Sequence, residues 1–184
     1  FINTDPERAR ELVVEFADFT RYSFRRHGDF TTLAEELRCI DRYLLLERAR
    51  FGDRVQVSLR IAPEVLSTVI PFLSLQPLVE NAIQHGIRDN MIADGFIRVT
   101  AHAENGRVIF EIMDNGDIPA SRIEEMNAAL RDYGSAQNFG IGMRNVDSRI
   151  RMFFKGDYGL SYQKRGEFTV AHIEIPVLEE DRYV

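Results

Sequence analysis

The sequence has very little cysteine and no excess of basic residues, and both shortages limit what the protein can be. Cys39 is the one cysteine among 184 residues, so the chain forms no intramolecular disulfide and no cysteine-based zinc site. We therefore expect a reducing compartment. Lysine and arginine total 23 against 29 aspartates and glutamates, a net charge of -6. Because nucleic-acid binding rests on a basic face that releases counterions, we do not expect nucleic acid as a partner.

The sequence also lacks a long apolar run. Its most apolar stretch, 65–79, is interrupted by Pro71 and Pro77, so we expect no membrane contact from this part of the protein. Residues 1–4, Phe-Ile-Asn-Thr, include neither an initiator methionine nor the basic region of a secretion signal. We expect the chain to be a piece of a larger protein.

Helical periodicity marks the first part of the chain. Thr4 and Glu7 have the spacing of a capping box, with Pro6 in the first turn, where its missing N–H costs nothing. Apolar residues then recur at helical spacing up to Phe24, and 27–29, His-Gly-Asp, is expected to end this helix.

A second helix is expected to begin at Thr32, with Glu35 completing the cap, and to continue through Phe51. Its apolar stripe is close to that of a coiled coil and consists of Leu33, Leu37, Ile40 and Leu44. Two interpretations remain open. The stripe packs on a partner chain, because a short helical hairpin buries little by itself, or it packs on its own domain.

From Gly52 onward, apolar and polar residues alternate in several segments, which is typical of half-buried strands. Asn105-Gly106 between two alternating runs indicates a hairpin. We expect strands at 55–61, 97–101, 108–112, 160–163 and 168–175, and helices at about 73–85, 121–132 and 141–154. The fold class is therefore α+β, with a mixed layer and an antiparallel sheet.

The expected helix near residue 80 has polar residues in an apolar context: Glu80, Asn81, Gln84 and His85. A polar side chain in mid-helix is unfavourable without a partner. The amide oxygen of Asn81 can serve as one ligand of Mg²⁺, which takes its other ligands from water and phosphates. Glu80 and His85 lie on neighbouring faces, where either can reach a phosphate. The alternative is a solvated helix edge, with Asn81 as a cap or a hydrogen-bonding core residue.

Asp114 ends the strand pattern 107–113 and is followed by Asn115 and Gly116. A carboxylate there can accept a hydrogen bond from an exocyclic amine such as that of adenine. Gly116 allows a planar base to lie close to the backbone. The same triplet is also an ordinary turn sequence, so the alternative is a turn without a ligand.

Gly140 and Gly142 flank Ile141 at an expected helix start, and Arg144 and Asn145 follow. Glycines allow a tight turn there, and the free N–H groups of a helix start favour an anion such as phosphate. The spacing fits neither a P-loop nor a dinucleotide-binding fingerprint. The alternative is a plain helix start.

The order of these features is informative: a polar helix, a strand ending in Asp-x-Gly, a loop and a Gly-x-Gly helix. In this the chain resembles the gyrase/Hsp90/histidine-kinase/MutL ATPase superfamily. Residues 75–86, Leu-Gln-Pro-Leu-Val-Glu-Asn-Ala-Ile-Gln-His-Gly, and 140–146, Gly-Ile-Gly-Met-Arg-Asn-Val, are similar to sensor histidine kinases of the LytS/YehU type. Segments 5–11, 21–23 and 47–52 match the helical region of that family, so the resemblance covers nearly the whole chain.

The resemblance implies a two-layer α/β sandwich of the Bergerat type, with a mixed, largely antiparallel sheet behind an N-terminal helical hairpin. Residues 1–52 would be truncated dimerisation and phosphotransfer helices, and 53–184 the ATP-binding catalytic domain. The protein would be a histidine kinase that transfers the γ-phosphoryl group of ATP to a histidine upstream of Phe1 and then to a response regulator of the LytTR or a related type. It would act as a homodimer, and this chain would be the cytoplasmic domain of an inner- or plasma-membrane sensor.

The resemblance also assigns roles to residues. Asn81 would bind Mg²⁺, Asp114 would recognise adenine, and Gly116 would shape the base pocket. Glu80 and His85 would be catalytic residues near the phosphates, and 133–139 a mobile lid. The remaining nucleotide contacts would come from Gln84, Gly140, Ile141, Gly142, Arg144 and Asn145.

The sequence departs from the family pattern in three places. The acceptor motif Asn-Pro-His-Phe is absent, so we expect no autophosphorylation of this chain alone. Gln84 stands where the family commonly has lysine, and 117–119, Asp-Ile-Pro, replaces a second glycine. These changes support an alternative, a degenerate nucleotide-binding or docking domain of the same fold. A third possibility, an ATP-hydrolysing clamp, is disfavoured because Pro77 stands where such enzymes have their catalytic glutamate.

Overall fold

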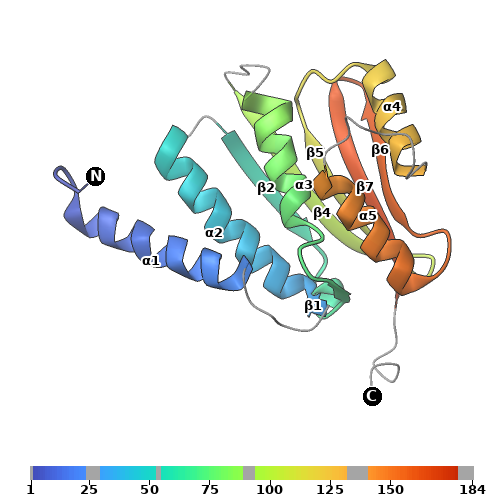
Figure 1. Ribbon diagram of the computed structural model, residues 1–184, viewed down its shortest axis with the longest axis horizontal. Helices are drawn as coiled ribbons and strands as arrows, with labels where there is room; N and C mark the ends of the chain where they lie inside the picture. Colours follow the sequence, from blue (N-terminus) through green and yellow to red (C-terminus); the bar gives the residue numbers. More distant parts are fainter. Residues whose placement is uncertain (1, 24–29, 53–54, 89–93, 132–140, 178–184) are drawn as a thin grey trace.

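The computed structural model describes residues 2–23, 30–52, 55–88, 94–131 and 141–177. It begins with two helices, α1 (Pro6–Ser23) and α2 (Leu33–Phe51), which lie along each other (Figure 1). The cap of α1 is Asp5, whose Oδ1 accepts the N–H of Arg8 at 3.0 Å. The expected cap at Thr4 is therefore wrong by one residue, because the carboxylate directly before Pro6 reaches the free N–H group. The expected helix end at 27–29 lies outside the described residues.

The second helix begins as expected, since Thr32 Oγ1 accepts the N–H of Glu35 at 3.3 Å. It ends at Gly52, whose φ of 72° is a left-handed conformation that favours glycine. The apolar stripe from Leu33 to Leu44 is buried in the same cluster as α3 and the sheet. Of the two interpretations, packing on its own domain is therefore the correct one.

A five-stranded sheet forms the second layer, in the order β2 (Val55–Ile61), β4 (Gly95–Glu104), β5 (Arg107–Asp114), β7 (Phe168–Pro176), β6 (Gly159–Arg165). Strand β2 runs parallel to β4, and the other neighbours are antiparallel. The β4–β5 hairpin turns at Asn105 and Gly106, both with positive φ, as the Asn-Gly pair predicts.

Two short strands were not predicted, β1 (Phe30–Thr32) and β3 (Val69–Pro71), which pair with each other. Three residues are too few to show alternation. A short 3₁₀ segment, η1 (Pro63–Val65), was also not predicted.

The helix expected at 73–85 instead comprises α3 (Gln76–Asn81) and a π-helical continuation, η2 (Ala82–Arg88). Leu73 has a φ of 56° and cannot belong to a right-handed helix, so α3 begins three residues later than expected. The helices α4 (Ala120–Arg131) and α5 (Ile141–Phe154) agree with the prediction.

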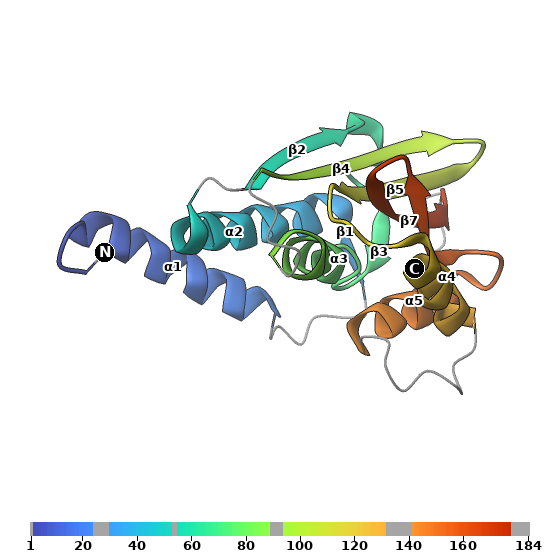
Figure 2. The same cartoon turned by 90° about the horizontal axis from the view of Figure 1, so that it is seen from above.

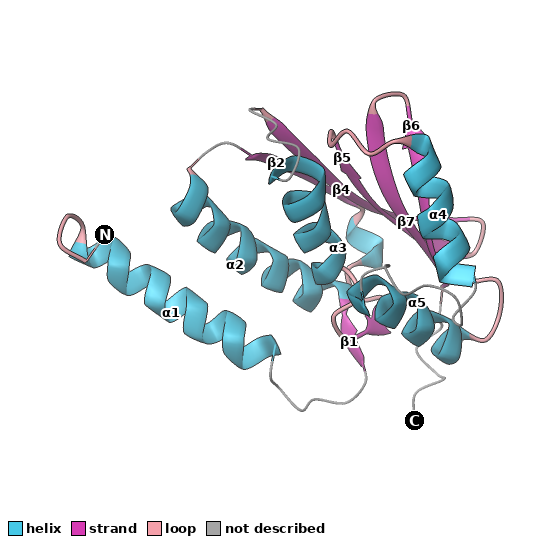
Figure 3. Ribbon diagram, turned by 45° about the horizontal axis from the view of Figure 1, so that its top comes forward, coloured by secondary structure: helices cyan, strands magenta, loops and turns pink. Residues whose placement is uncertain are grey.

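The helices cover one face of the sheet. Figure 2 shows α2, α3, α4 and α5 on the same side of β4, β5 and β7, and Figure 3 shows α1 outside this layer. Strand β5 alternates between buried and half-buried positions along its whole length, so its buried residues face the helices. The expected fold, a two-layer α+β sandwich with a mixed sheet behind two N-terminal helices, is confirmed.

Candidate nucleotide-binding site

Asp114 is the last residue of β5 and lies on its helix-facing side, where it is 4% exposed. Its Oδ1 accepts the N–H of Gly116 at 2.8 Å, so the turn closes on the carboxylate. Burial raises the pKa of Asp114 to about 6, although the Gly116 N–H and the charge of Lys164 oppose this shift. Among the described residues, Gly116 is the one hydrogen-bond donor to this carboxylate.

Asn115 points away from this carboxylate toward the start of β4. Its Oδ1 accepts the N–H of Phe96 at 2.8 Å, and its Nδ2 donates to the carbonyl of Asp94 at 2.9 Å. Asn115 therefore holds the turn in place and leaves Asp114 facing the helix layer.

Thr169 lies beside Asp114 and Gly116, and the sequence did not indicate it. It is paired in register with Asp114 across β5 and β7 and is 1% exposed. Its hydroxyl donates to the carbonyl of Gly116 at 3.5 Å. The one signal in the sequence was a threonine at an inward position of an otherwise apolar strand face, and alternation alone does not separate it from a core residue.

Asn81 ends α3 and is half-buried. It hydrogen-bonds to the hydroxyl of Tyr162 in β6, and that hydroxyl donates to the Sδ of Met143 in α5 at 2.9 Å. Burial raises the pKa of Tyr162, and the nearby charge of Asp114 raises it further. Because the Tyr162 proton is given to Met143, the amide nitrogen of Asn81 is the donor, which leaves its oxygen for another partner.

The other polar residues of this helix differ in exposure. Glu80 is half-buried, and its Oε1 accepts the Nε2–H of Gln76 at 2.7 Å. Gln84 is half-buried and His85 is exposed, and both lie in the π-helical segment η2. A π-turn contains more residues than an α-turn, so it rotates Gln84 and His85 away from the positions that a regular helix would give them.

The Gly-x-Gly segment lies at the start of α5. Gly142 is exposed, and within the described residues a Cβ added there would meet no atom within 4 Å beyond its own helix backbone and chain neighbours, so a ligand has room to approach the backbone. Arg144 is half-buried and Asn145 is exposed. Ile141 is the first residue of α5, whereas Gly140 and the expected lid at 133–139 lie outside the described residues.

These residues fit a nucleotide. The Asp114 carboxylate is almost fully buried, and one of its oxygens already accepts a hydrogen bond. It therefore suits a ligand that supplies its own N–H donor, such as the amine of adenine. The described residues include no cluster of three His, Cys, Asp or Glu side chains that could hold a metal ion. An Mg²⁺ ion at Asn81 would therefore take its other ligands from water and phosphates, which is its usual coordination in nucleotide sites.

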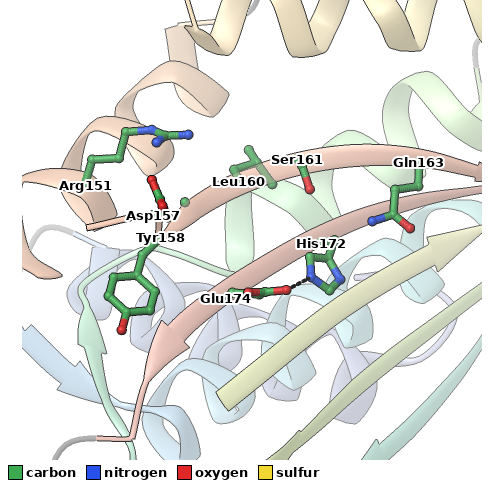
Figure 4. Close-up of a pocket in the computed structure, with 9 residues that line it drawn as sticks. Arg151, Asp157, Tyr158, Leu160, Ser161, Gln163, His172 and Glu174 are labelled. Carbon is green, nitrogen blue, oxygen red and sulfur yellow. Dashed lines mark hydrogen bonds and ion pairs between the residues drawn. The ribbon is translucent and has the colours of Figure 1, made fainter. Parts of the chain in front are cut away.

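A hollow of about 320 Å³ lies elsewhere, at the edge strand β6 and the other face of β7 (Figure 4). No predicted site residue lines it. His172 lies there between two carboxylates, with Nδ1 3.0 Å from Glu111 and Nε2 3.0 Å from Glu174. Arg165 also pairs with Glu111, and Arg107 with Glu174, so polar and charged side chains link neighbouring strands on the face of the sheet that the helices do not cover.

Comparisons with known proteins identify the family of the chain. Residues 1–55 match a family described as histidine kinase, and residues 72–179 match one described as histidine kinase-, DNA gyrase B-, and HSP90-like ATPase. Sensor histidine kinase BtsS of Escherichia coli (strain K12) is 35% identical over 161 residues, which covers 87% of this chain and 26% of BtsS. Sensor protein LytS of Staphylococcus saprophyticus is 29% identical over 185 residues, which covers 98% of this chain and 31% of LytS.

Among solved structures, histidine kinase ThkA in complex with response regulator protein TrrA has a similar fold. The TM-score is 0.54 at 18% identity, and the match covers 98% of this chain and 52% of that chain.

The chain belongs to the histidine kinase-, DNA gyrase B-, and HSP90-like ATPase family. Within this family its relatives are sensor histidine kinases, and it carries the ATP-binding catalytic region of such a kinase, as the motifs imply. The chain spans 26% of the length of BtsS and 31% of the length of LytS. No described helix combines the length and apolar character that a membrane span needs.

Proposed function

We propose that the protein containing this chain transfers the γ-phosphoryl group of ATP to a histidine side chain and then to an aspartate of a response regulator. The observation that carries the proposal is the buried Asp114 carboxylate. One oxygen is held by Gly116, and the inward-facing Thr169 lies opposite in the sheet. A buried carboxylate held in this way suits adenine, and the family supplies the reaction class.

In this proposal Asp114 accepts the exocyclic amine of adenine and Gly116 lies against the base. Asn81 contributes one oxygen to Mg²⁺, whose charge neutralises the phosphates. The start of α5 offers free N–H groups to the phosphates. The further phosphate contacts are Gln84, Gly140, Ile141, Gly142, Arg144 and Asn145.

Transfer forms a bond between the acceptor imidazole nitrogen and the γ-phosphorus and breaks the bond to the β–γ bridging oxygen, which leaves as part of ADP. Glu80 accepts the imidazole proton, and His85 lies one helical turn further on. A positioned base contributes about 10²- to 10⁴-fold to such a rate. The rest of catalysis is positioning and charge neutralisation.

The partners also belong to this proposal. A response regulator of the LytTR or a related type receives the phosphoryl group. In support, histidine kinase ThkA, which has a similar fold, forms a complex with response regulator protein TrrA. Residues 1–52 act as dimerisation helices of a homodimer, and 53–184 as the catalytic domain, on the cytoplasmic side of a membrane sensor. In support, α1 buries none of its residues in this chain, and Val13 and Phe16 are 67% and 59% exposed.

The test is calorimetric titration of ADP, with and without Mg²⁺, into this chain and into two variants. Asp114→Ala should weaken ADP binding by about tenfold or more, because a buried hydrogen bond to a charged group is lost. Glu124→Ala, which removes an exposed carboxylate of α4 that is not among the predicted site residues, should leave the affinity within about twofold. No ADP binding by the unmutated chain would contradict the nucleotide site.

A degenerate docking domain of the same fold is the second candidate, and Gln84 in place of a lysine favours it. Incorporation of label from γ-labelled ATP by the full-length protein separates the two candidates. If the protein is a kinase, we expect acid-labile label on a histidine. If the chain is a docking domain, we expect ADP binding but no incorporation of label.

A further inference from the structure

A continuous hydrogen-bonded path joins α2 to the candidate catalytic carboxylate. The thiol of Cys39 in α2 donates to Gln76 Oε1 at 2.9 Å, and Gln76 Nε2 donates to Glu80 Oε1 at 2.7 Å. Cys39 and Gln76 are 1% and 6% exposed, and Glu80 is half-buried. In Figure 3, α2 and α3 lie side by side in the helix layer.

The chemistry of the two neighbours fixes the orientation of the Gln76 amide. Burial raises the pKa of the Cys39 thiol to about 12, and the charge of Glu36 adds to this shift, so the thiol keeps its proton and donates. A carboxylate is an acceptor. Rotating the amide by 180° would bring its NH₂ group against the thiol donor and its oxygen against Glu80, so one orientation is favoured.

The turn before α3 is fixed from both sides. The carboxylate of Glu36 in α2 accepts the N–H groups of Leu73 and Leu75 at 2.7 Å and 3.0 Å. From α5, Arg149 donates to the carbonyls of Leu73, at 3.0 Å, and Phe72. Because the first residue of α3 follows directly, the backbone of Gln76 is held by helices on either side.

We propose that Gln76 is a positioning residue for Glu80, which fixes the direction of its carboxylate and makes that direction depend on the contact between α2 and α3. The inference rests on the proposed function, in which Glu80 accepts the proton of the acceptor imidazole. A free glutamate samples several rotamers, whereas a hydrogen bond from a buried and immobile amide selects one. A misplacement of a base by about 1 Å can cost about 10²-fold in rate.

The alternative is a purely structural role, in which Gln76 and Glu80 form one of the common side-chain pairs four residues apart on a helix. Such a pair would affect stability alone. The two interpretations differ in whether the effect of Gln76 on the rate needs the Glu80 carboxylate, and a double-mutant cycle measures this directly.

The experiment uses the full-length protein and measures three quantities: the Kd of ADP, the KM of ATP, and the kcat of label incorporation from γ-labelled ATP. Gln76→Met keeps the length and burial of the side chain but removes both hydrogen bonds. It should lower kcat by about tenfold or more and change KM and Kd by less than about twofold. The matched control is Gln163→Met on the other face of the sheet, which should change none of the three.

Two further comparisons sharpen the test, and the second of them keeps the inference falsifiable if Gln76→Met folds poorly. In a Glu80→Gln background, Gln76→Met should cause no further loss of kcat, because the carboxylate that it positions is gone. Cys39→Ser retains a donor and should stay within about twofold of the unmutated kcat, whereas Cys39→Val fills the space without a donor and should lower it several-fold.

An unchanged kcat in Gln76→Met, or losses that add in the double variant, would overturn the inference while leaving the proposed function intact. A rise in KM with kcat unchanged would also overturn it, since Gln76 would then act on nucleotide binding. If the unmutated protein binds ADP but incorporates no label, the proposed function itself fails, and the role of Gln76 fails with it.

Discussion

The carboxylate of Glu36 accepts the backbone N–H of Leu75 at 3.0 Å, directly before the first residue of α3. The second carboxylate oxygen of Glu36, Oε1, accepts the backbone N–H of Leu73 at 2.7 Å. Glu36 has no exposed surface, and burial raises its pKa. A side chain of α2 therefore satisfies N–H groups that a helix start leaves without partners and also stabilises the left-handed Leu73.

Replacing Glu36 by alanine should be strongly destabilising, because it leaves buried N–H groups without acceptors. We expect a loss of about 3 kcal/mol or more in the free energy of unfolding, and a smaller loss for Glu36→Gln, which retains one acceptor oxygen. Urea denaturation measures both. The control is Glu124→Ala on the exposed side of α4, which should stay within about 0.5 kcal/mol. An equal, small effect of both alanine substitutions would contradict the role of Glu36.

Asp114→Asn should stabilise the chain at neutral pH while weakening nucleotide binding. The pKa of Asp114 is raised from 3.8 to about 6 in the folded state, so between these values the folded state binds more protons than the unfolded state. Stability from this group therefore falls as the pH rises through that window. Above the window the buried charge costs up to about 3 kcal/mol.

The measurement compares the free energy of unfolding of the unmutated chain and Asp114→Asn at about pH 4 and about pH 7.5. The variant should gain most at the higher pH and little at the lower. A gain that does not depend on pH would mean that Asp114 is not a buried, ionising carboxylate.

Asn81→Ala should remove the Mg²⁺ dependence of binding of a non-hydrolysable ATP analogue, and ADP binding without Mg²⁺ should change by less than about twofold. Tyr162→Phe should cause a smaller loss of the same kind, because it removes the hydroxyl that holds the Asn81 amide. Calorimetric titration measures both, with Tyr158→Phe as a control. If Asn81→Ala retains the full Mg²⁺ effect, another ligand holds the metal.

Gly159→Ala should destabilise the chain far more than Gly166→Ala, although both residues have positive φ. A Cβ at Gly159 would lie 2.5 Å from Asp147 Oδ1 and 2.8 Å from Arg151 Nη2, whereas at Gly166 it would meet nothing within 4 Å. We expect a loss of about 3 kcal/mol at Gly159 and about 1 kcal/mol at Gly166. Thermal unfolding orders the two variants, and equal shifts would contradict the close approach of Asp147.

Local features of the sequence predicted much of the fold. The Thr32 cap, the alternation of β5, the Asn105-Gly106 turn and the bounds of α5 all follow from rules that act over a few residues. The sequence did not predict the left-handed conformation of Leu73 or the π-helical segment at 82–88, because no residue type nearby is specific for either. The same holds for Thr169, whose place opposite Asp114 depends on the register of two strands.

The sequence by itself determined the family and the order of the longer helices and strands, and it predicts a set of nucleotide-binding residues, because each motif is a short segment whose chemistry is fixed by its own residues. It did not determine the partner of the α2 stripe, which fits a second chain or its own domain equally well. Only the tertiary structure decided this, because the stripe is buried against α3 and the sheet, and Cys39 beside it contacts Gln76, 37 residues further along the chain. Such contacts join residues that are distant in the sequence, and local periodicity carries no information about which distant segments pack together.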